Sequence, residues 1–126
     1  MSNDFYVQMR DILDEYSKDV QDATNNSIDK VSKESVKMLR NNSPKRPGGG
    51  EYARSWGTKK DRGNGRINTV TVRNKDHYQL THLLENGHVI VNGKGTYGRV
   101  PGKKHIAPVE QWANSELPNE IKRELE

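Results

Sequence analysis

The chain has 126 residues, of which 30% are hydrophobic and 30% charged, and its mean hydropathy is −1.08. This length predicts one domain with a modest core, and the low apolar content approaches that of disordered chains, so we expect assembly partners to order part of it. The absence of cysteine excludes a disulfide framework and thiol chemistry, and no apolar run approaches the ~18 residues of a membrane span.

The net charge of +4 is unevenly distributed along the chain. Residues 40–75 carry ten basic and two acidic side chains, whereas residues 1–39 carry five and eight, and residues 109–126 carry two and five. A basic middle between acidic ends favours head-to-tail contact between copies of the chain, or one face that meets a polyanion.

A long helix is the first predicted element. Apolar residues recur from Phe5 to Leu39 with a 3.6-residue period, which predicts a helix over residues 1–40 with room for a bend near Asn25. Such a helix would be ~55 Å long, longer than the ~30 Å of a small domain. It either covers a core or forms an exposed arm that packs on a neighbouring subunit, and its length requires a partner for some of it.

A flexible basic loop is expected over residues 41–51. Ser43–Pro44 ends the helix because proline disfavours helical geometry in the residue before it. Pro47 and the glycines that follow keep the chain irregular. Two interpretations stay open for this loop, a solvated linker or a contact for DNA or a partner ring.

A β-hairpin should follow. Residues 52–60 have a loose strand pattern with Tyr52, Arg54 and Trp56 on one face, and residues 67–73 alternate clearly around a turn at 61–65. We expect Trp56 to be a core anchor rather than a platform for stacking bases. We also expect the loop and this turn to be the most mobile parts of the free protein.

A short central helix is predicted between Tyr78 and His88. Leu80, Leu83 and Leu84 have the i, i+3, i+4 spacing of one helix face, which we expect to be buried in a core. Gly87 stands where a helix usually stops, because glycine adopts the left-handed conformation without a Cβ clash.

The remaining segments complete an α+β fold with a small antiparallel sheet. Residues 89–91 and 96–100 flank turn residues and predict a second hairpin. Pro108 suits the first turn of a C-terminal helix, whose apolar side carries Val109, Trp112 and Ala113. Pro118 is expected to interrupt this helix, with a last turn or two beyond it.

A metal or nuclease site is the sharpest enzymatic alternative, built from His82, Glu85, His88 and His105. The spacing is poor for zinc, since His88 lies beyond Gly87, and no second carboxylate cluster is near. We therefore favour histidines that form hydrogen bonds and a Glu85 that pairs with a base such as Arg54. No nucleophile elbow or phosphate loop is present, and the glycines at 93, 95 and 98 lack the helix that a dinucleotide fingerprint requires. No catalytic residue, metal or cofactor is predicted.

Four motifs together resemble a known family. They are residues 82–88, residues 105–108 (His-Ile-Ala-Pro), the helix stop at Ser43–Pro44, and residues 50–56 with their glycine, tyrosine, serine and tryptophan. In their order along the chain they resemble the minor tail components of long-tailed phages, also called tail-completion or head–tail joining proteins, over roughly residues 35–125. The run of three glycines before Glu51 departs from the family pattern, so no loop geometry is carried over.

The resemblance implies a single head–tail joining domain over residues 1–126, with the sheet and central helix in 52–108 and the last helix in 109–126. It implies a structural virion protein at the phage neck, assembled in the host cytoplasm, whose copies form a ring described as hexameric. Its partners would be other copies, head connector or stopper proteins, tail terminator or tail tube proteins, and DNA passing through the lumen. The isolated chain could equally be a monomer, and no membrane is involved.

The basic middle also supports a runner-up function, a nucleic-acid-binding module without sequence preference. The residues expected to face DNA or a partner are Lys45, Arg46, Arg54, Lys59, Lys60, Arg62 and Arg66. The residues expected to form the structural core motif are Tyr52, Trp56, Leu80, Leu83, Leu84, Gly87, His105, Ile106, Pro108 and Trp112.

Overall fold

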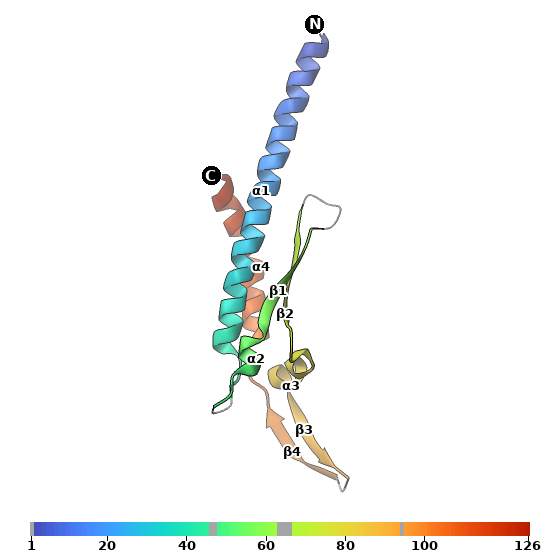
Figure 1. Ribbon diagram of the computed structural model, residues 1–126, viewed down its shortest axis with the longest axis vertical. Coiled ribbons are helices and arrows are strands. Elements are labelled where there is room, and N and C mark those ends of the chain that lie inside the picture. The colour runs from blue at the N-terminus through green and yellow to red at the C-terminus, as the bar shows by residue number, and fades with distance from the viewer. Residues whose placement is uncertain (1, 46–47, 63–66, 94) are drawn as a thin grey trace.

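A computed structural model describes residues 2–45, 48–62, 67–93 and 95–126. It is an elongated α+β fold with two long helices side by side and two separate antiparallel hairpins (Figure 1). In chain order the elements are α1 (Ser2–Asn42), α2 (Glu51–Arg54), β1 (Trp56–Asp61), β2 (Thr69–Asn74), the 3-10 helix η1 (Tyr78–Leu80), α3 (Thr81–Asn86), β3 (Gly87–Asn92), β4 (Gly95–Pro101) and α4 (Ile106–Leu125). The predicted α+β class is confirmed, with its long first helix, short central helix and C-terminal helix.

The helix α1 extends well beyond the rest of the molecule (Figure 1). Its C-terminal half packs against α4 and the β1–β2 hairpin, whereas its N-terminal part continues past the end of α4 (Figure 1). The helix is unbroken at Asn25, where the sequence allowed a bend. A long helix with an uncovered end is therefore a property of the isolated subunit.

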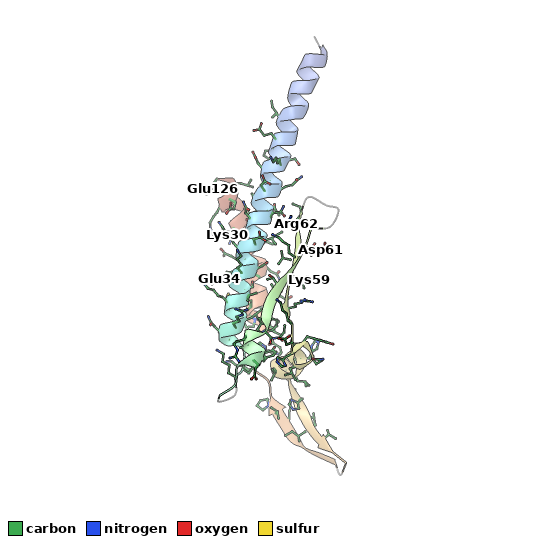
Figure 2. The ribbon with its side chains drawn as sticks, viewed as in Figure 1. Lys30, Glu34, Lys59, Asp61, Arg62 and Glu126 are labelled. Atoms are coloured by element: carbon green, nitrogen blue, oxygen red, sulfur yellow. The ribbon has the colours of Figure 1, made fainter. Side chains whose placement is uncertain are left out.

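A stripe of small residues lets α4 approach α1 closely. From Ala23 onward every fourth residue of α1 is buried, in the series Ala23, Ser27, Val31, Ser35 and Leu39, and Ser43, just after the helix, continues the series. The hydroxyls of Ser27 and Ser35 each donate to the carbonyl four residues earlier at 2.7 Å, which satisfies these buried groups without a partner on α4. At the outer edge, Lys30 pairs with Glu120 and Glu124 near the end of α4, where Figure 2 labels Lys30 and Glu126.

The core is small and lies where α1, α2, β1 and α4 meet. Its buried side chains are Leu39, Tyr52, Trp56 and Val109, with Val36, Met38, Val72, Leu84 and Ile106 packed against them. The Trp56 indole Nε1–H donates to the Ser43 hydroxyl at 2.8 Å, and the Arg40 guanidinium donates to the Trp56 carbonyl, also at 2.8 Å. Trp56 thus closes the core and fixes the end of α1 to the start of β1.

The segment from Tyr52 to Arg54 is a helical turn, so the expectation of a strand there is wrong. The amide of Arg54 donates to the Gly50 carbonyl at 3.0 Å, and the strand β1 begins only at Trp56. Helical spacing places Tyr52 and Trp56 on one buried side, with their rings edge to face at 5.9 Å, and leaves Arg54 exposed. A strand would place Arg54 on the same face as the two aromatic rings, whereas the helical turn keeps the rings together and directs Arg54 away from them.

Each hairpin is a two-stranded sheet of its own. Register pairs Trp56 with Asn74 in β1–β2 and Gly87 with Pro101 in β3–β4, with an irregularity at Ile90/Val91 in the second. The β1–β2 hairpin packs on α1, whereas β3–β4 projects from the opposite end of the molecule to the N-terminus (Figure 1).

Two further expectations need correction. Leu80 and Leu83 are 38% and 43% exposed, so the leucine face of the central helix is not buried in this subunit, and only Leu84 reaches the core. The helix α4 continues through Pro118 instead of breaking there. Pro118 is exposed, and packing on α1 outweighs the one backbone hydrogen bond that the proline removes.

Part of the predicted mobile loop and turn lies outside the described residues. Arg46, Pro47 and residues 63–66 belong to that part. Within the described residues, the predicted flexible loop 41–51 begins inside α1 and ends inside α2, and Ser43 is buried. The loop is therefore fixed at both ends by the core.

We expect Leu83 and Leu84 to respond differently to truncation. Leu84→Ala should lower the free energy of unfolding by about 2 kcal/mol, the low end for a core leucine, because Leu84 is half-buried. Leu83→Ala should change it by less than about 0.5 kcal/mol, as expected for a surface site. Urea denaturation of the isolated chain measures both, and equal losses at the two sites would show that the α3 packing described above is wrong.

Candidate functional site

A buried carboxylate ties α3 to the start of α4. Glu85 Oε1 accepts the amides of His105 and Ile106 at 2.8 and 2.9 Å, and Oε2 accepts the amide of Ala107 at 3.0 Å. The first amides of a helix have no partners inside it and carry its positive dipole end, so a carboxylate is well suited to cap them. Burial would raise the pKa of the Glu85 carboxyl, but these three backbone donors and the nearby His105 bring the pKa below its ordinary value.

The His105 ring joins this cap to α2. Its Nδ1 lies 2.7 Å from the Lys103 carbonyl and 3.0 Å from Glu85 Oε1, both acceptors, so Nδ1 carries a hydrogen. In the neutral ring Nε2 is then an acceptor, and the Tyr52 hydroxyl, 2.7 Å away, donates to it. Burial first, and the Glu85 charge second, raise the pKa of Tyr52 to about 12, so this donor is protonated at neutral pH. We call Tyr52, Glu85 and His105 the polar junction.

Two glycines bring the chain together beside the polar junction. Gly87 has φ +81°, and a Cβ there would lie 2.4 Å from the Val100 carbonyl oxygen. A Cβ on Gly102 would lie 2.5 Å from the backbone of Glu85 and Asn86. At the base of the β3–β4 hairpin the backbone segments thus approach so closely that only glycine fits. The hairpin's direction is therefore set by α3 and α4.

Two of the four residues of the metal alternative, Glu85 and His105, have a structural role in the polar junction. The expected pairing of Glu85 with Arg54 is wrong, because the Glu85 oxygens accept the backbone amides at the start of α4. His105 is fully buried against Tyr52, while His82 on α3 is exposed. Within the described ranges, no cluster of three or more histidine, aspartate or glutamate side chains could hold a metal ion.

The basic segment is divided between the two faces of the β1–β2 hairpin. Lys60 lies opposite Val70 in register, and its ammonium pairs with Asp29 of α1 at 3.2 Å, so it faces α1. Lys59 lies opposite Thr71 and is exposed on the other face. Neighbouring strand residues alternate between faces, so these two lysines cannot form one patch.

The other predicted contact residues are spread along the hairpin. Arg62 is exposed just beyond the end of β1, and Figure 2 shows Lys59, Asp61 and Arg62 following one another along this strand. Lys45 and Arg54 are exposed near the opposite end, beside α2. Arg46 and Arg66 lie outside the described residues. The described residues among the seven predicted contact residues do not form a continuous cationic strip.

Exposed apolar side chains mark both ends of the subunit. On β3 and β4 they are Val89, Ile90, Val91 and Val100, next to Leu80 and Leu83 of the central helix region. On α1 they are Ile12 and Tyr16, each 66% exposed. Large exposed apolar side chains gathered in one region are typical of protein–protein contact sites.

Local sequence patterns do not predict the polar junction. Glu85 stands 21 residues before the first residue of α4, and no local motif links a carboxylate to a helix start at that distance. His105 immediately precedes α4, and that position was visible, but its partner Tyr52 is 53 residues away in the chain. Long-range hydrogen bonds of this kind depend on topology and not on local pattern.

One comparison with known proteins found a matching family. A family model described as "Bacteriophage HK97-gp10, putative tail-component" matches residues 8–87, from the first turns of α1 to the end of α3. Searches of curated proteins and of solved structures gave no significant match. In the described part of the chain, no helix is both long and apolar enough to cross a membrane. The matched range covers more than half of the sequence, and the chain therefore belongs to the HK97-gp10-like family of phage tail components.

Proposed function

We propose that this phage tail component is a structural protein of the virion neck, where its copies form a ring between the head connector and the tail and leave a passage for DNA. The observation that carries the proposal is the uncovered apolar surface at both ends of an elongated subunit. Such a subunit is completed by neighbours on two sides, which a ring of identical copies provides. Membership of a tail-component family supports the structural role.

The polar junction supports a structural role for its residues. A catalytic base needs access to a substrate, whereas His105 is fully buried and both of its ring nitrogens are engaged. Glu85 is likewise occupied by backbone amides. These groups hold α2, α3 and α4 together, and the surfaces outside them would make the contacts with connector and tail proteins.

The test is a phage that lacks this protein. We expect the mutant phage to accumulate DNA-filled heads and separate tails that do not join, visible by electron microscopy, and we expect the protein supplied in trans to restore infectious particles. Tails of abnormal length with normal joining would instead place the protein elsewhere in the tail. Fully infectious particles without the protein would refute the proposed function.

The nucleic-acid-binding module remains a second candidate because Lys59 on β1 and Arg62 just beyond its end are exposed. DNA that slides through a ring tolerates only weak contacts. We therefore expect the isolated chain to bind DNA weakly, with log K falling by about 0.9 per neutralised phosphate against log salt. Titration at two salt concentrations measures this, and micromolar binding near physiological salt would favour the second candidate.

Charge reversal tests whether these exposed charges take part in either role. Lys59→Glu with Arg62→Glu should leave the subunit folded, because exposed charges away from the core contribute little to stability. We expect this variant to fail in complementation, whereas Lys122→Glu, exposed on α4, serves as the matched control and should succeed. Complementation by both variants would remove the exposed charges of β1 from either role.

A further inference from the structure

The described apolar side chains of the β3–β4 hairpin are not covered within the subunit. Its base contacts α3, but its side chains gain little burial, and Val91 is 66% exposed. Val89 and Val91 are two residues apart and share one face of β3, and Arg99 lies directly opposite Val89. A two-stranded hairpin alone is marginally stable in water, so a partner that covers this face would stabilise it.

The N-terminal arm, residues 2–22 of α1, has the matching character. Ile12, Glu15, Tyr16 and Asp19 follow the i, i+3, i+4, i+7 spacing of one helix face, and all four are exposed. Two large apolar side chains therefore lie beside two carboxylates. A helix face of this kind requires a partner that is both apolar and basic.

The two surfaces carry opposite charge. Residues 1–22 contain six acidic and two basic side chains, whereas residues 87–104 contain four basic side chains and no acidic one. Arg99, Lys103 and Lys104 are exposed at the base of the hairpin. Arg99 also donates to the Asn86 carbonyl at 2.8 Å, which holds its side chain against the end of α3.

We propose that the N-terminal arm of one copy docks on the β3–β4 hairpin of the next. Within one subunit the arm and the hairpin lie at opposite ends (Figure 1), so this contact can form only between copies. Ile12 and Tyr16 would cover Val89 and Val91, and Glu15 and Asp19 would face Arg99 and Lys103. The inference rests on the proposed ring and specifies which surfaces join neighbouring copies.

Other surfaces of the subunit fit the arm less well. A groove of about 400 Å³ between α1, β2 and α4 is lined by apolar residues such as Val70, Val72 and Val109, but the charged side chain in its lining is Glu110, which would repel an acidic helix. The outer face of β1–β2 carries Lys59 and Arg73 beside threonines. It offers charge without apolar area, whereas the β3–β4 hairpin supplies both.

The contact uses different patches on the two copies, and this gives it a direction. In an open chain of contacts, the subunit at one end keeps a free arm and the subunit at the other end keeps a free hairpin. Such head-to-tail contacts form a ring when the rotation between neighbours closes, and a filament when it does not. Opposite charges at the two ends would also speed and orient the encounter between copies.

Disulfide trapping tests the contact directly, because the natural chain has no cysteine. Tyr16→Cys and Val91→Cys replace exposed side chains on the arm and the hairpin. Mixed under oxidising conditions, the two single-cysteine variants should give a covalent heterodimer about tenfold faster than a control mixture, because docking raises the effective concentration of the two thiols. The control pairs Val91→Cys with Lys37→Cys, an exposed position near the other end of α1.

The double variant Tyr16→Cys/Val91→Cys distinguishes this contact from others. It should give a ladder of covalent oligomers in solution and in purified particles. Arm-to-arm dimers would indicate a symmetric contact instead, and crosslinks from Val91→Cys to a different virion protein would assign the hairpin to another partner. Either result, or crosslinking no faster than in the control in both settings, overturns the inference. If the particles are joined and infectious without the ladder, the inference fails while the proposed neck function stands.

A charge swap adds a second readout. Glu15→Lys with Asp19→Lys in the arm variant should slow crosslinking to the level of the control pair. Adding Arg99→Glu and Lys103→Glu to the hairpin variant should restore fast crosslinking, because the arm and the hairpin then again carry opposite charges. Slowing without restoration would mean that the acidic face of the arm contacts something other than these two basic residues, and would overturn the pairing.

Discussion

Glu85→Ala should lower the free energy of unfolding by about 3–5 kcal/mol, because a buried donor left without an acceptor costs about 1–3 kcal/mol and three donors are affected. The substitution leaves the amides of His105, Ile106 and Ala107 without their acceptor at a buried helix start. It also removes the negative charge that opposes the dipole of α4. Urea or thermal denaturation measures the loss.

The control for Glu85 is Glu34→Ala, which removes a half-exposed carboxylate from α1 and should change stability by less than about 0.5 kcal/mol. Glu85→Gln keeps one oxygen acceptor but loses the charge, so we expect an intermediate loss. If Glu85→Ala and Glu34→Ala denature alike, the polar junction does not hold α4 in place.

The same carboxylate predicts how stability depends on pH. Its pKa is lower in the folded chain than in the unfolded chain, so the unfolded state binds a proton first as the pH falls. The stabilisation is therefore complete above the ordinary carboxyl range and is lost as the pH falls through the folded-state value. Denaturation of the natural chain and of Glu85→Gln across this range should show a shallower pH dependence for the variant.

Glu120 makes this pH comparison between variants necessary. The pKa of Glu120 is also lowered, mainly by its hydrogen bond to Lys30. Burial opposes this shift, and a further hydrogen bond to Arg123 adds to it. Glu120 is retained in both proteins, so the difference between the two pH profiles isolates Glu85. Identical profiles would contradict a lowered folded-state pKa at Glu85.

Trp56→Ala is the second large effect, and we expect a loss of about 3–5 kcal/mol, the range for truncating a buried tryptophan. The side chain is 4% exposed and contacts the rings of Tyr52 and His105. Truncation leaves a cavity in the centre of a small core and removes the donor to the Ser43 hydroxyl. Chemical denaturation followed by circular dichroism measures it.

Two variants bracket the result for Trp56. Trp56→Phe keeps much of the aromatic volume but cannot donate to Ser43, so its loss should be smaller. Trp112→Ala, at a half-buried tryptophan on α4, should also cost less than Trp56→Ala. A loss for Trp112→Ala that equals or exceeds the loss for Trp56→Ala would mean that the core is centred between α1 and α4 rather than around α2.

Glu85 and Trp56 would also matter for the proposed assembly, because the core positions the surfaces at the ends of the molecule. Glu85 stands two residues before Gly87, where the β3–β4 hairpin begins, and its amide partners stand at the start of α4. Loosening the polar junction would leave the hairpin without a fixed direction relative to α1. A ring requires the same angle at every contact, so even a folded Glu85→Gln subunit should assemble less well.

Much of the local structure could be predicted from the sequence alone. The apolar period from Phe5 to Leu39 indicated α1, the alternating residues 67–73 indicated β2, and Gly87 indicated the end of α3. These features depend on neighbours within a few residues, so local pattern suffices to predict them. The resemblance to phage tail components also depended on short motifs, and the family match confirmed it.

The tertiary structure decided where those elements bury their side chains. The i, i+3, i+4 spacing of Leu80, Leu83 and Leu84 gave a helix, yet only Leu84 meets the core, because periodicity identifies an apolar face without saying what covers it. Tyr52 lies in a helical turn because its ring must meet Trp56 and its hydroxyl must reach His105. The partner of Glu85 could not be chosen from sequence, since the three amides that it binds lie 20 to 22 residues further along the chain. Such contacts arise only when the fold brings distant backbone groups together, and a buried carboxylate binds whichever donors the fold leaves unpaired beside it.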